Sequence, residues 1–225
     1  MNIAERALEF LKDGDVVGLG TGRAATAFVR ALGIRAQAGL RIRGIPTSQV
    51  TTDLAQELGI PLTTFEQVDT IDVAVDGADE VDPQLNLIKG YGGALVREKI
   101  VAAAAKQFVI LVGTEKLVAT LGERGKLPVE VVPFGLTTCC RHLCALSCNP
   151  TPRETEAGLF VSDNGNALID CEISTIAQPA EFEQKILSIP GVVGTGLFVG
   201  MAHTVLIQNG QDGEAVQVRE RDTPN

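Results

Sequence analysis

The sequence lacks any apolar run long enough to cross a bilayer, which takes roughly 18 to 20 residues. The segment FVILVG at residues 108–113 is typical of its longest apolar runs. Charged residues interrupt the first helix-like stretch at Glu5, Arg6, Glu9 and Lys12, which excludes the uninterrupted apolar core of a signal peptide. We therefore expect a cytoplasmic protein with no membrane partner.

Positive charge is scarce, and the spacing of the cysteines is not that of a disulfide framework. The chain has 19 Lys and Arg against 28 Asp and Glu, a formal net charge of −9. This average field repels a polyanion, so we expect no nucleic-acid partner, although a local basic cluster could still bind a small phosphate. The five cysteines are an odd number, as expected for reduced thiols in the cytosol.

Histidine is also scarce, since the chain has only His142 and His203. Neither lies near a Ser or Cys nucleophile motif, so we expect no catalytic triad. Cys140, Cys144 and Cys148 recur every four residues, but one helical stripe does not easily close the tetrahedron of a zinc site. The sequence therefore predicts buried thiols at this cluster and no metal.

What remains is the composition of a globular protein, with 45% hydrophobic and 21% charged residues among 225. A strand, loop and helix pattern at 16–33 is followed by strand-like segments at 40–48, 60–65, 71–75 and 108–113, with helix-like segments at 49–59 and 94–107. This alternation predicts a Rossmann-like α/β fold, with a mostly parallel sheet flanked by helices.

The pattern changes near KLPVEVVPFG at residues 126–135. A strand-like VEVV precedes a helix-like segment at 136–147, a predicted hairpin around Asn164–Gly165 and a helix-like segment at 179–189. These elements predict a second, smaller α+β domain. We expect residues 1–126 and a returning segment 201–225 to form the Rossmann-like catalytic domain, and 127–200 to form the small domain.

The glycine-rich segment GLGTGRAATAF at 18–28 lies between a predicted strand and a predicted helix. Free amides at a helix start bind anions, so the loop is interpreted as a phosphate site or, alternatively, as a plain tight turn. Arg23 stands where the dinucleotide fingerprint has a glycine, and no Gly-Lys-Ser/Thr of a Walker loop follows. This spacing disfavours a dinucleotide-dependent oxidoreductase.

The most charged segment is VDGADEVDPQLNLIKGYGGALVREK at 75–99. Taken singly, Asp76 and Asp79 can be turn caps, and Lys89 and Glu98 can be solvated surface charges. Taken together, carboxylates, a lysine and a glycine turn are what proton abstraction next to a carbonyl requires. The set therefore favours enolisation of a sugar phosphate.

These segments, with GTEK at 113–116, LPVEVVPFG, FVSDNGNALID and IPGVVGTGLF, resemble the motif series of ribose-5-phosphate isomerase type A along essentially the whole chain. The resemblance implies interconversion of D-ribose 5-phosphate and D-ribulose 5-phosphate through a cis-enediolate in the non-oxidative pentose phosphate pathway. It implies no metal or organic cofactor, and a homodimer or homotetramer.

The resemblance also implies residue roles. Glu98 is the implied general base, Lys89 the oxyanion stabiliser, and Asp76 and Asp79 the groups that bind hydroxyls and assist ring opening. Implied substrate contacts are Thr21, Gly22, Arg23 and Ala24 at the phosphate, with Asp76, Gly77, Ala78, Asp79, Lys89, Gly90, Tyr91, Gly92 and Lys116 along the sugar. Tyr91 either contacts the substrate or covers the loop.

The sequence departs from the family pattern in two respects. Arg23 and Ala24 stand where the family commonly has a Ser-Thr pair. One lysine that many relatives carry in the first helix, ahead of the strand, has no counterpart in this chain. Both changes bear on phosphate binding, whereas the proton-transfer set is intact. The alternative function is a non-catalytic phosphosugar-sensing module on the same scaffold, against which the retention of Glu98 argues.

Overall fold

The computed structural model describes residues 2–208 and 215–221. The chain forms two compact units, each of which is described by itself. The first comprises Met1–Ala78, Arg97–Leu117 and Gly200–Asn225, and the second comprises Asp79–Val96 and Val118–Val199. The polypeptide therefore passes from one unit to the other four times.

This division differs from the bounds expected from the sequence, because residues 79–96 and 118–126 lie in the second unit. Two short strands of the charged segment, β4 (Glu80–Val81) and β5 (Leu87–Ile88), explain the first difference. They form a three-stranded antiparallel sheet with β13 (Leu197–Phe198), which comes more than a hundred residues later in the chain.

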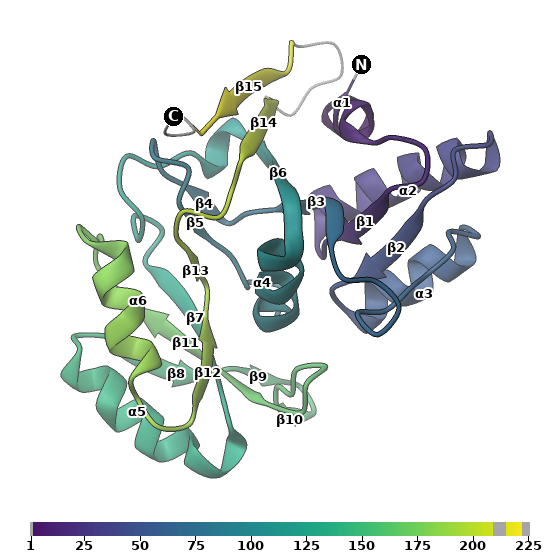
Figure 1. Ribbon diagram of the computed structural model, residues 1–225. Coiled ribbons are helices and arrows are strands. Elements are labelled where there is room, and N and C mark those ends of the chain that lie inside the picture. The colour runs from purple at the N-terminus through teal and green to yellow at the C-terminus, as the bar shows by residue number, and fades with distance from the viewer. Residues whose placement is uncertain (1, 209–214, 222–225) are drawn as a thin grey trace. The chain divides into compact units, whose positions relative to one another are not determined.

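The first unit contains a six-stranded sheet in the order β15-β14-β6-β3-β1-β2 (Figure 1). Its strands are β1 (Val16–Leu19), β2 (Arg43–Pro46), β3 (Ile71–Gly77), β6 (Ala105–Gly113), β14 (Thr204–Gln208) and β15 (Gln217–Glu220). All neighbours pair in parallel except β15, which is antiparallel to β14. The predicted mostly parallel sheet is confirmed, with the C-terminal segment returning to it.

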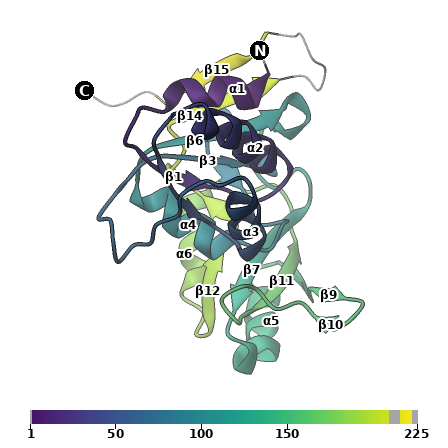
Figure 2. The same ribbon diagram turned by 90° about the vertical axis from the view of Figure 1, so that its right-hand side faces the viewer.

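Helices cover both faces of this sheet, as expected when parallel strands are buried on both sides. Figure 2 shows α1 (Ile3–Ala7), α2 (Arg23–Gln37) and α3 (Gln49–Glu57) together on one side, where they share a core with alternate strand residues. A short 3-10 helix, η1 (Leu8–Phe10), follows α1. On the other face, α4 (Leu95–Ala104) places Val101 against Gly18, where an added Cβ would meet Val101 Cγ1 at 2.5 Å.

The strand expected at 60–65 does not form. The segment meets β2 at a single bridge between Gly44 and Leu62, with hydrogen bonds from Gly44 N to Pro61 O and from Thr63 N to Gly44 O. The following residues leave the sheet edge in turns, so its apolar residues pack against the core without extending a ladder.

The second unit contains an antiparallel sheet in the order β12-β7-β11-β8, which confirms a smaller α+β part. Its elements are β7 (Lys126–Val131), β8 (Asn149–Pro152), β11 (Ala167–Glu172), β12 (Val192–Thr195), α5 (Leu136–Ala145) and α6 (Pro179–Leu187). A further short hairpin pairs β9 (Glu154–Thr155) with β10 (Gly158–Leu159), and η3 (Pro133–Gly135) leads into α5. The core lies where both helices pack against this sheet.

The predicted hairpin around Asn164–Gly165 forms only at its tip. Ser162 N donates to Asn166 O, Gly165 N donates to Ser162 O, and Gly165 has φ +78°. Beyond one bridge between Val161 and Ala167, the second arm continues as β11 and pairs with β7 and β8. The turn signal was therefore correct, but the pairing of the arms was not.

The cysteine cluster is only partly buried. Cys139 and Cys148 are buried, Cys140 is half-buried and Cys144 is exposed. Within the described residues, no group of three His, Cys, Asp or Glu is placed to hold a metal ion. No described helix combines the length and the apolar character needed to cross a membrane.

Candidate active site

Asp76 lies near the carboxyl end of β3 in the first unit and is 2% exposed. Its Oδ1 accepts hydrogen bonds from Thr21 N (3.2 Å) and Gly77 N (2.7 Å). An added Cβ at Gly20 would lie 2.2 Å from Asp76 Cγ. Gly20 is therefore required because the glycine loop passes directly over this carboxylate.

Thr21 turns its hydroxyl toward the start of α3. Its Oγ1 lies 2.7 Å from Thr47 Oγ1, 2.8 Å from Ser48 Oγ and 3.2 Å from Thr51 Oγ1. Ser48 is also the N-cap of α3, because its side chain accepts from Thr51 N. This hydroxyl cluster connects the glycine loop to α3.

The glycine loop ends at the start of the 15-residue helix α2. Gly22 is the N-cap with φ +103°, and Arg23 is the first helical residue. Free amides and the helix dipole make such a terminus favourable for an anion. Gly22 and Arg23 are exposed and Ala24 is half-buried, so the expected phosphate segment is accessible at least in part.

Glu98 lies in the first turn of α4 and is 4% exposed. Because α4 leads directly into β6, its start lies at the edge of the sheet where the parallel strands end. Lys116, in the 3-10 helix η2 (Thr114–Lys116), follows the carboxyl end of β6 at the same edge. Ligands of open α/β sheets bind outside this edge.

The first unit therefore carries nine of the expected site residues at or beside one sheet edge: Thr21, Gly22, Arg23, Ala24, Asp76, Gly77, Ala78, Glu98 and Lys116. The remaining five, Asp79, Lys89, Gly90, Tyr91 and Gly92, belong to the second unit. Sequence position alone did not show that the charged segment is divided in this way.

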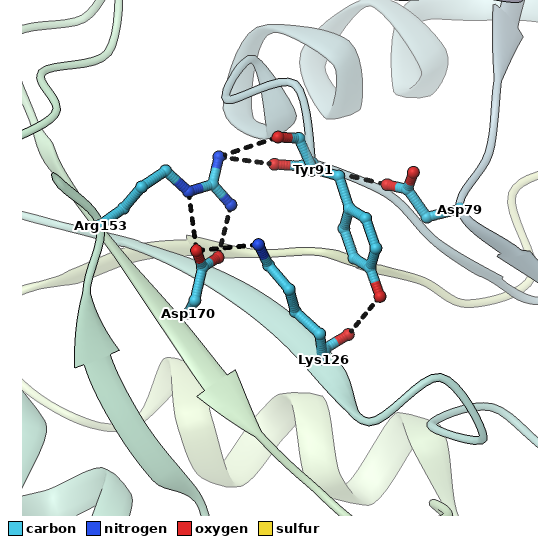
Figure 3. Close-up of polar contacts among 6 residues, drawn as sticks. Asp79, Tyr91, Lys126, Arg153 and Asp170 are labelled. Atoms are coloured by element: carbon cyan, nitrogen blue, oxygen red, sulfur yellow. Dashed lines mark hydrogen bonds and ion pairs between the residues drawn. The ribbon is translucent and has the colours of Figure 1, made fainter. Parts of the chain in front are cut away.

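In the second unit, residues 90–93 form a tight turn directly after Lys89. Gly93 N donates to Gly90 O (3.0 Å), and both glycines have positive φ, +89° and +99°. Asp79 Oδ2 accepts from Tyr91 N at 3.0 Å (Figure 3). The structure thus brings Asp79 and the glycine turn together within the second unit.

Lys89 is 2% exposed although it carries a charge. Its backbone N donates to Gly196 O (2.8 Å), and its Nζ lies 5.5 Å from the centre of the Phe198 ring. A cation held against an aromatic face in a buried position gains electrostatic attraction. The lysine is therefore a buried group of the second unit, and the solvated alternative is wrong for this residue.

Tyr91 packs its ring against Lys126. Its hydroxyl donates to Lys126 O (3.2 Å), and Lys126 Nζ lies 4.9 Å from the ring centre. Burial, followed by the charge of Asp79, raises the pKa of Tyr91. The hydroxyl therefore stays protonated at neutral pH.

Sequence reasoning missed two groups near these residues. Glu80 is fully buried, accepts from Gly122 N (2.6 Å) and Arg124 N (2.9 Å), and has its pKa raised mainly by burial. Arg153 contacts the glycine turn from more than sixty residues away. The first was visible as the acid in DGADE, whereas the second had no local signal.

Comparison with known proteins identifies the family. Residues 43–212 match the family model of ribose 5-phosphate isomerase A (phosphoriboisomerase A). The ribose-5-phosphate isomerase A of Roseiflexus sp. (strain RS-1) is 51% identical over 93% of this chain and 91% of its own. That of Bradyrhizobium diazoefficiens is 44% identical over 98% and 95%.

Solved structures agree with this result. A D-ribose-5-phosphate isomerase in complex with phospho-erythronic acid matches with a TM-score of 0.92 and 40% identity, over 97% of this chain and 96% of that one. The ribose 5-phosphate isomerase of Plasmodium falciparum matches with a TM-score of 0.93 and 33% identity, over 98% and 97%. The chain therefore belongs to the ribose 5-phosphate isomerase A family.

Proposed function

We propose that this protein is a cofactor-independent aldose-ketose isomerase that interconverts D-ribose 5-phosphate and D-ribulose 5-phosphate. The observation that carries the proposal is the buried carboxylate of Glu98, held in the first turn of α4 at the sheet edge where Asp76 also lies. Membership of the isomerase family supports it. The pathway is the non-oxidative pentose phosphate pathway, in the cytoplasm.

In the proposed mechanism, the carboxylate of Glu98 removes the proton from C2 of the open-chain aldose. The electron pair of that C–H bond forms the C1–C2 double bond, and the carbonyl oxygen on C1 becomes the enediolate oxygen. Return of the proton from Glu98 to C1, with transfer of the O2 proton to the enediolate oxygen on C1, gives the ketose and regenerates the carboxylate. A positioned base of this kind contributes roughly 10²–10⁴-fold.

The other residues bind and stabilise the substrate. Lys89 is the cation that offsets the developing oxyanion, since a preorganised charge is most effective away from water. Asp76 and Asp79 accept hydrogen bonds from hydroxyls and assist ring opening. The amides at the start of α2, with the Arg23 guanidinium, hold the phosphate, and Lys116 binds the substrate end.

Glu98→Gln tests the role of the base. We expect kcat for ketose formation to fall by about 10²–10⁴-fold, because an amide of the same shape does not accept the proton. Binding of ribose 5-phosphate, measured by calorimetry, should survive. Glu57→Gln is the matched control, since Glu57 is exposed at the end of α3.

The outcomes separate the two candidate functions. Absence of ketose formation by the wild-type protein after chelation of metals would overturn the proposal. Binding of ribose 5-phosphate without turnover would instead indicate the phosphosugar-sensing module. We also propose a homodimer or homotetramer, which light scattering on the purified protein would test.

A further inference from the structure

Arg153 donates hydrogen bonds to the glycine turn at residues 90–93. It has no part in the catalytic and binding roles proposed above. It lies between β8 and β9, with an 11% exposed side chain. Its Nη1 donates to Gly90 O (3.2 Å) and to Tyr91 O (3.1 Å). Figure 3 shows Arg153 beside Tyr91 and Asp170. One guanidinium nitrogen therefore holds two consecutive carbonyls of the turn.

The guanidinium is itself held rigidly. Arg153 Nε donates to Asp170 Oδ2 (2.9 Å) and Nη2 donates to Oδ1, and Lys126 Nζ lies 2.9 Å from Asp170 Oδ2. Burial by itself raises the pKa of Asp170, but the hydrogen bonds from Arg153 and Lys126 bring it below its ordinary value. A planar guanidinium bound to a carboxylate by two hydrogen bonds has a fixed direction.

Two further contacts hold the same turn. Asp79 accepts from Tyr91 N, so the peptide between Gly90 and Tyr91 is bound by Arg153 at its C=O and by Asp79 at its N–H. The Phe160 ring packs against the other end of the turn, at Gly93, where an added Cβ would lie 2.5 Å from Phe160 Cζ. The Arg153 guanidinium also lies 5.6 Å from the centre of that ring.

The peptide between Tyr91 and Gly92 is oriented by the same guanidinium. Tyr91 O is bound by Arg153, and in a trans peptide the N–H points opposite to the C=O. The Gly92 amide is therefore directed away from the guanidinium, and Gly92 is exposed. A cation on the carbonyl also polarises the peptide, which strengthens its N–H as a donor.

We propose that Arg153 is a positioning residue for the isomerase reaction, which fixes the planes of the turn peptides so that the Gly92 amide and the adjacent Lys89 meet the substrate. The proposal rests on the proposed function. Arg153 does not touch the substrate and acts only through the turn. Asp170 and Lys126 maintain its direction.

If the Arg153–Asp170 ion pair had only a structural role, substitution of Arg153 would lower thermal stability and leave the kinetics of the folded protein unchanged. The test therefore compares Arg153→Met and Arg153→Lys at a temperature where both are folded by circular dichroism. Arg141→Met is the matched control, because Arg141 is exposed on α5 of the same unit.

We expect Arg153→Met to lower kcat for ribose 5-phosphate by about 10–100-fold with little change in KM, since small misplacements of binding groups cost about 10²-fold. Arg153→Lys should show an intermediate loss, because a single ammonium replaces the rigid fork. Added guanidinium ion at low millimolar concentration should restore part of kcat to Arg153→Ala. Arg141→Met should match the wild type.

Wild-type kcat and KM in folded Arg153→Met would overturn the proposal, whatever its melting temperature. If that variant does not fold, unchanged kcat in Arg153→Lys would overturn it equally. Hydrogen exchange of the amides of residues 90–93 can be measured without an activity assay. The exchange rate should be higher in Arg153→Met than in the wild type. An inactive wild type would refute the proposed function, whereas unchanged exchange in the variant would refute the positioning role alone.

Discussion

The absence of a side chain at Gly20 allows the glycine loop to pass close to the buried carboxylate of Asp76. A Cβ at this position would meet Asp76 at Cγ (2.2 Å), Oδ1 (2.3 Å) and Cα (2.7 Å). Gly20→Ala should therefore displace either the loop or Asp76, with a loss of about 1–3 kcal/mol in the free energy of unfolding and a marked loss of kcat. Urea titration and the isomerase assay measure the two effects.

Gly39→Ala is the control for that prediction. Gly39 has φ +108° but nothing lies within 4 Å of an added Cβ, so the cost is the backbone strain of about 1 kcal/mol. Its kcat should stay at the wild-type value. Equal kcat in both variants would show that the loop does not need to approach Asp76.

Asp170 gives a prediction about pH. Its pKa is lowered in the folded protein, so its contribution to stability is present above the unfolded pKa of about 3.9 and is lost as pH falls through the lower folded value. Asp170→Asn should thus be less stable than the wild type at pH 7, and the difference should shrink below about pH 4. Urea titrations at both pH values measure it.

At this scale the sequence predicted a shared role for residues that lie in one segment. Asp76, Asp79, Lys89 and Glu98 lie within 23 positions of one another, and their chemistry suggested a common role. Arg153 could not be found in the same way, because its contact with the turn depends on how β8, β11 and the turn pack. Their packing has no local sequence pattern.

At the scale of elements, the Ser162–Asn166 turn is joined to β7 by one buried carboxylate. Glu130 is fully buried, and its Oε1 accepts from Ser162 Oγ (2.9 Å), Asn164 Nδ2 (3.0 Å) and Asn166 Nδ2 (2.9 Å). Hydrogen bonds to a charged acceptor contribute more than neutral ones. This carboxylate explains why a turn with only one bridge is nevertheless well anchored.

Glu130→Ala should therefore lower the free energy of unfolding by about 2–4 kcal/mol, since three donors lose their acceptor. Glu172→Ala on β11 is the matched control, because Glu172 is exposed and should cost about 0.5 kcal/mol or less. Urea unfolding followed by circular dichroism compares them. Equal losses would contradict the anchoring role.

Two segments that the sequence predicted as strands, 71–75 and 60–65, had different outcomes. The apolar run at 71–75 is an interior strand of the sheet and was clear from its Val and Ile. The segment 60–65, IPLTTF, also has several residues that favour strands but lies beside the edge strand β2, where only one bridge forms. Composition does not distinguish these cases, because the difference lies in which partner strand is available.

At the scale of the molecule, the first unit depends on a strand from the end of the chain. Val205, Leu206 and Ile207 of β14 are at most 1% exposed, and burial of each side chain stabilises by about 1.5–3 kcal/mol. Their sum is comparable to the entire stability of a typical domain, about 5–15 kcal/mol. A chain that stops after Val199 should therefore fail to form a folded first unit.

A chain that stops after residue 214 is the control. It keeps β14 and loses β15, whose four residues are exposed, so it should remain folded with a modest loss of stability. Soluble yield and urea titration distinguish the two truncations. A cooperatively folded protein that ends at Val199 would contradict the dependence on β14.

The four crossings between the units also determine the order in which the protein can be completed during synthesis. Domains usually fold from the N-terminus as the chain emerges, yet here β14 joins β6 only after all of the second unit has left the ribosome. Until then, the nascent chain exposes the unpaired edge of β6. Such an edge is a template for aggregation, so we expect the newly made protein to be most prone to aggregation before β14 pairs with β6.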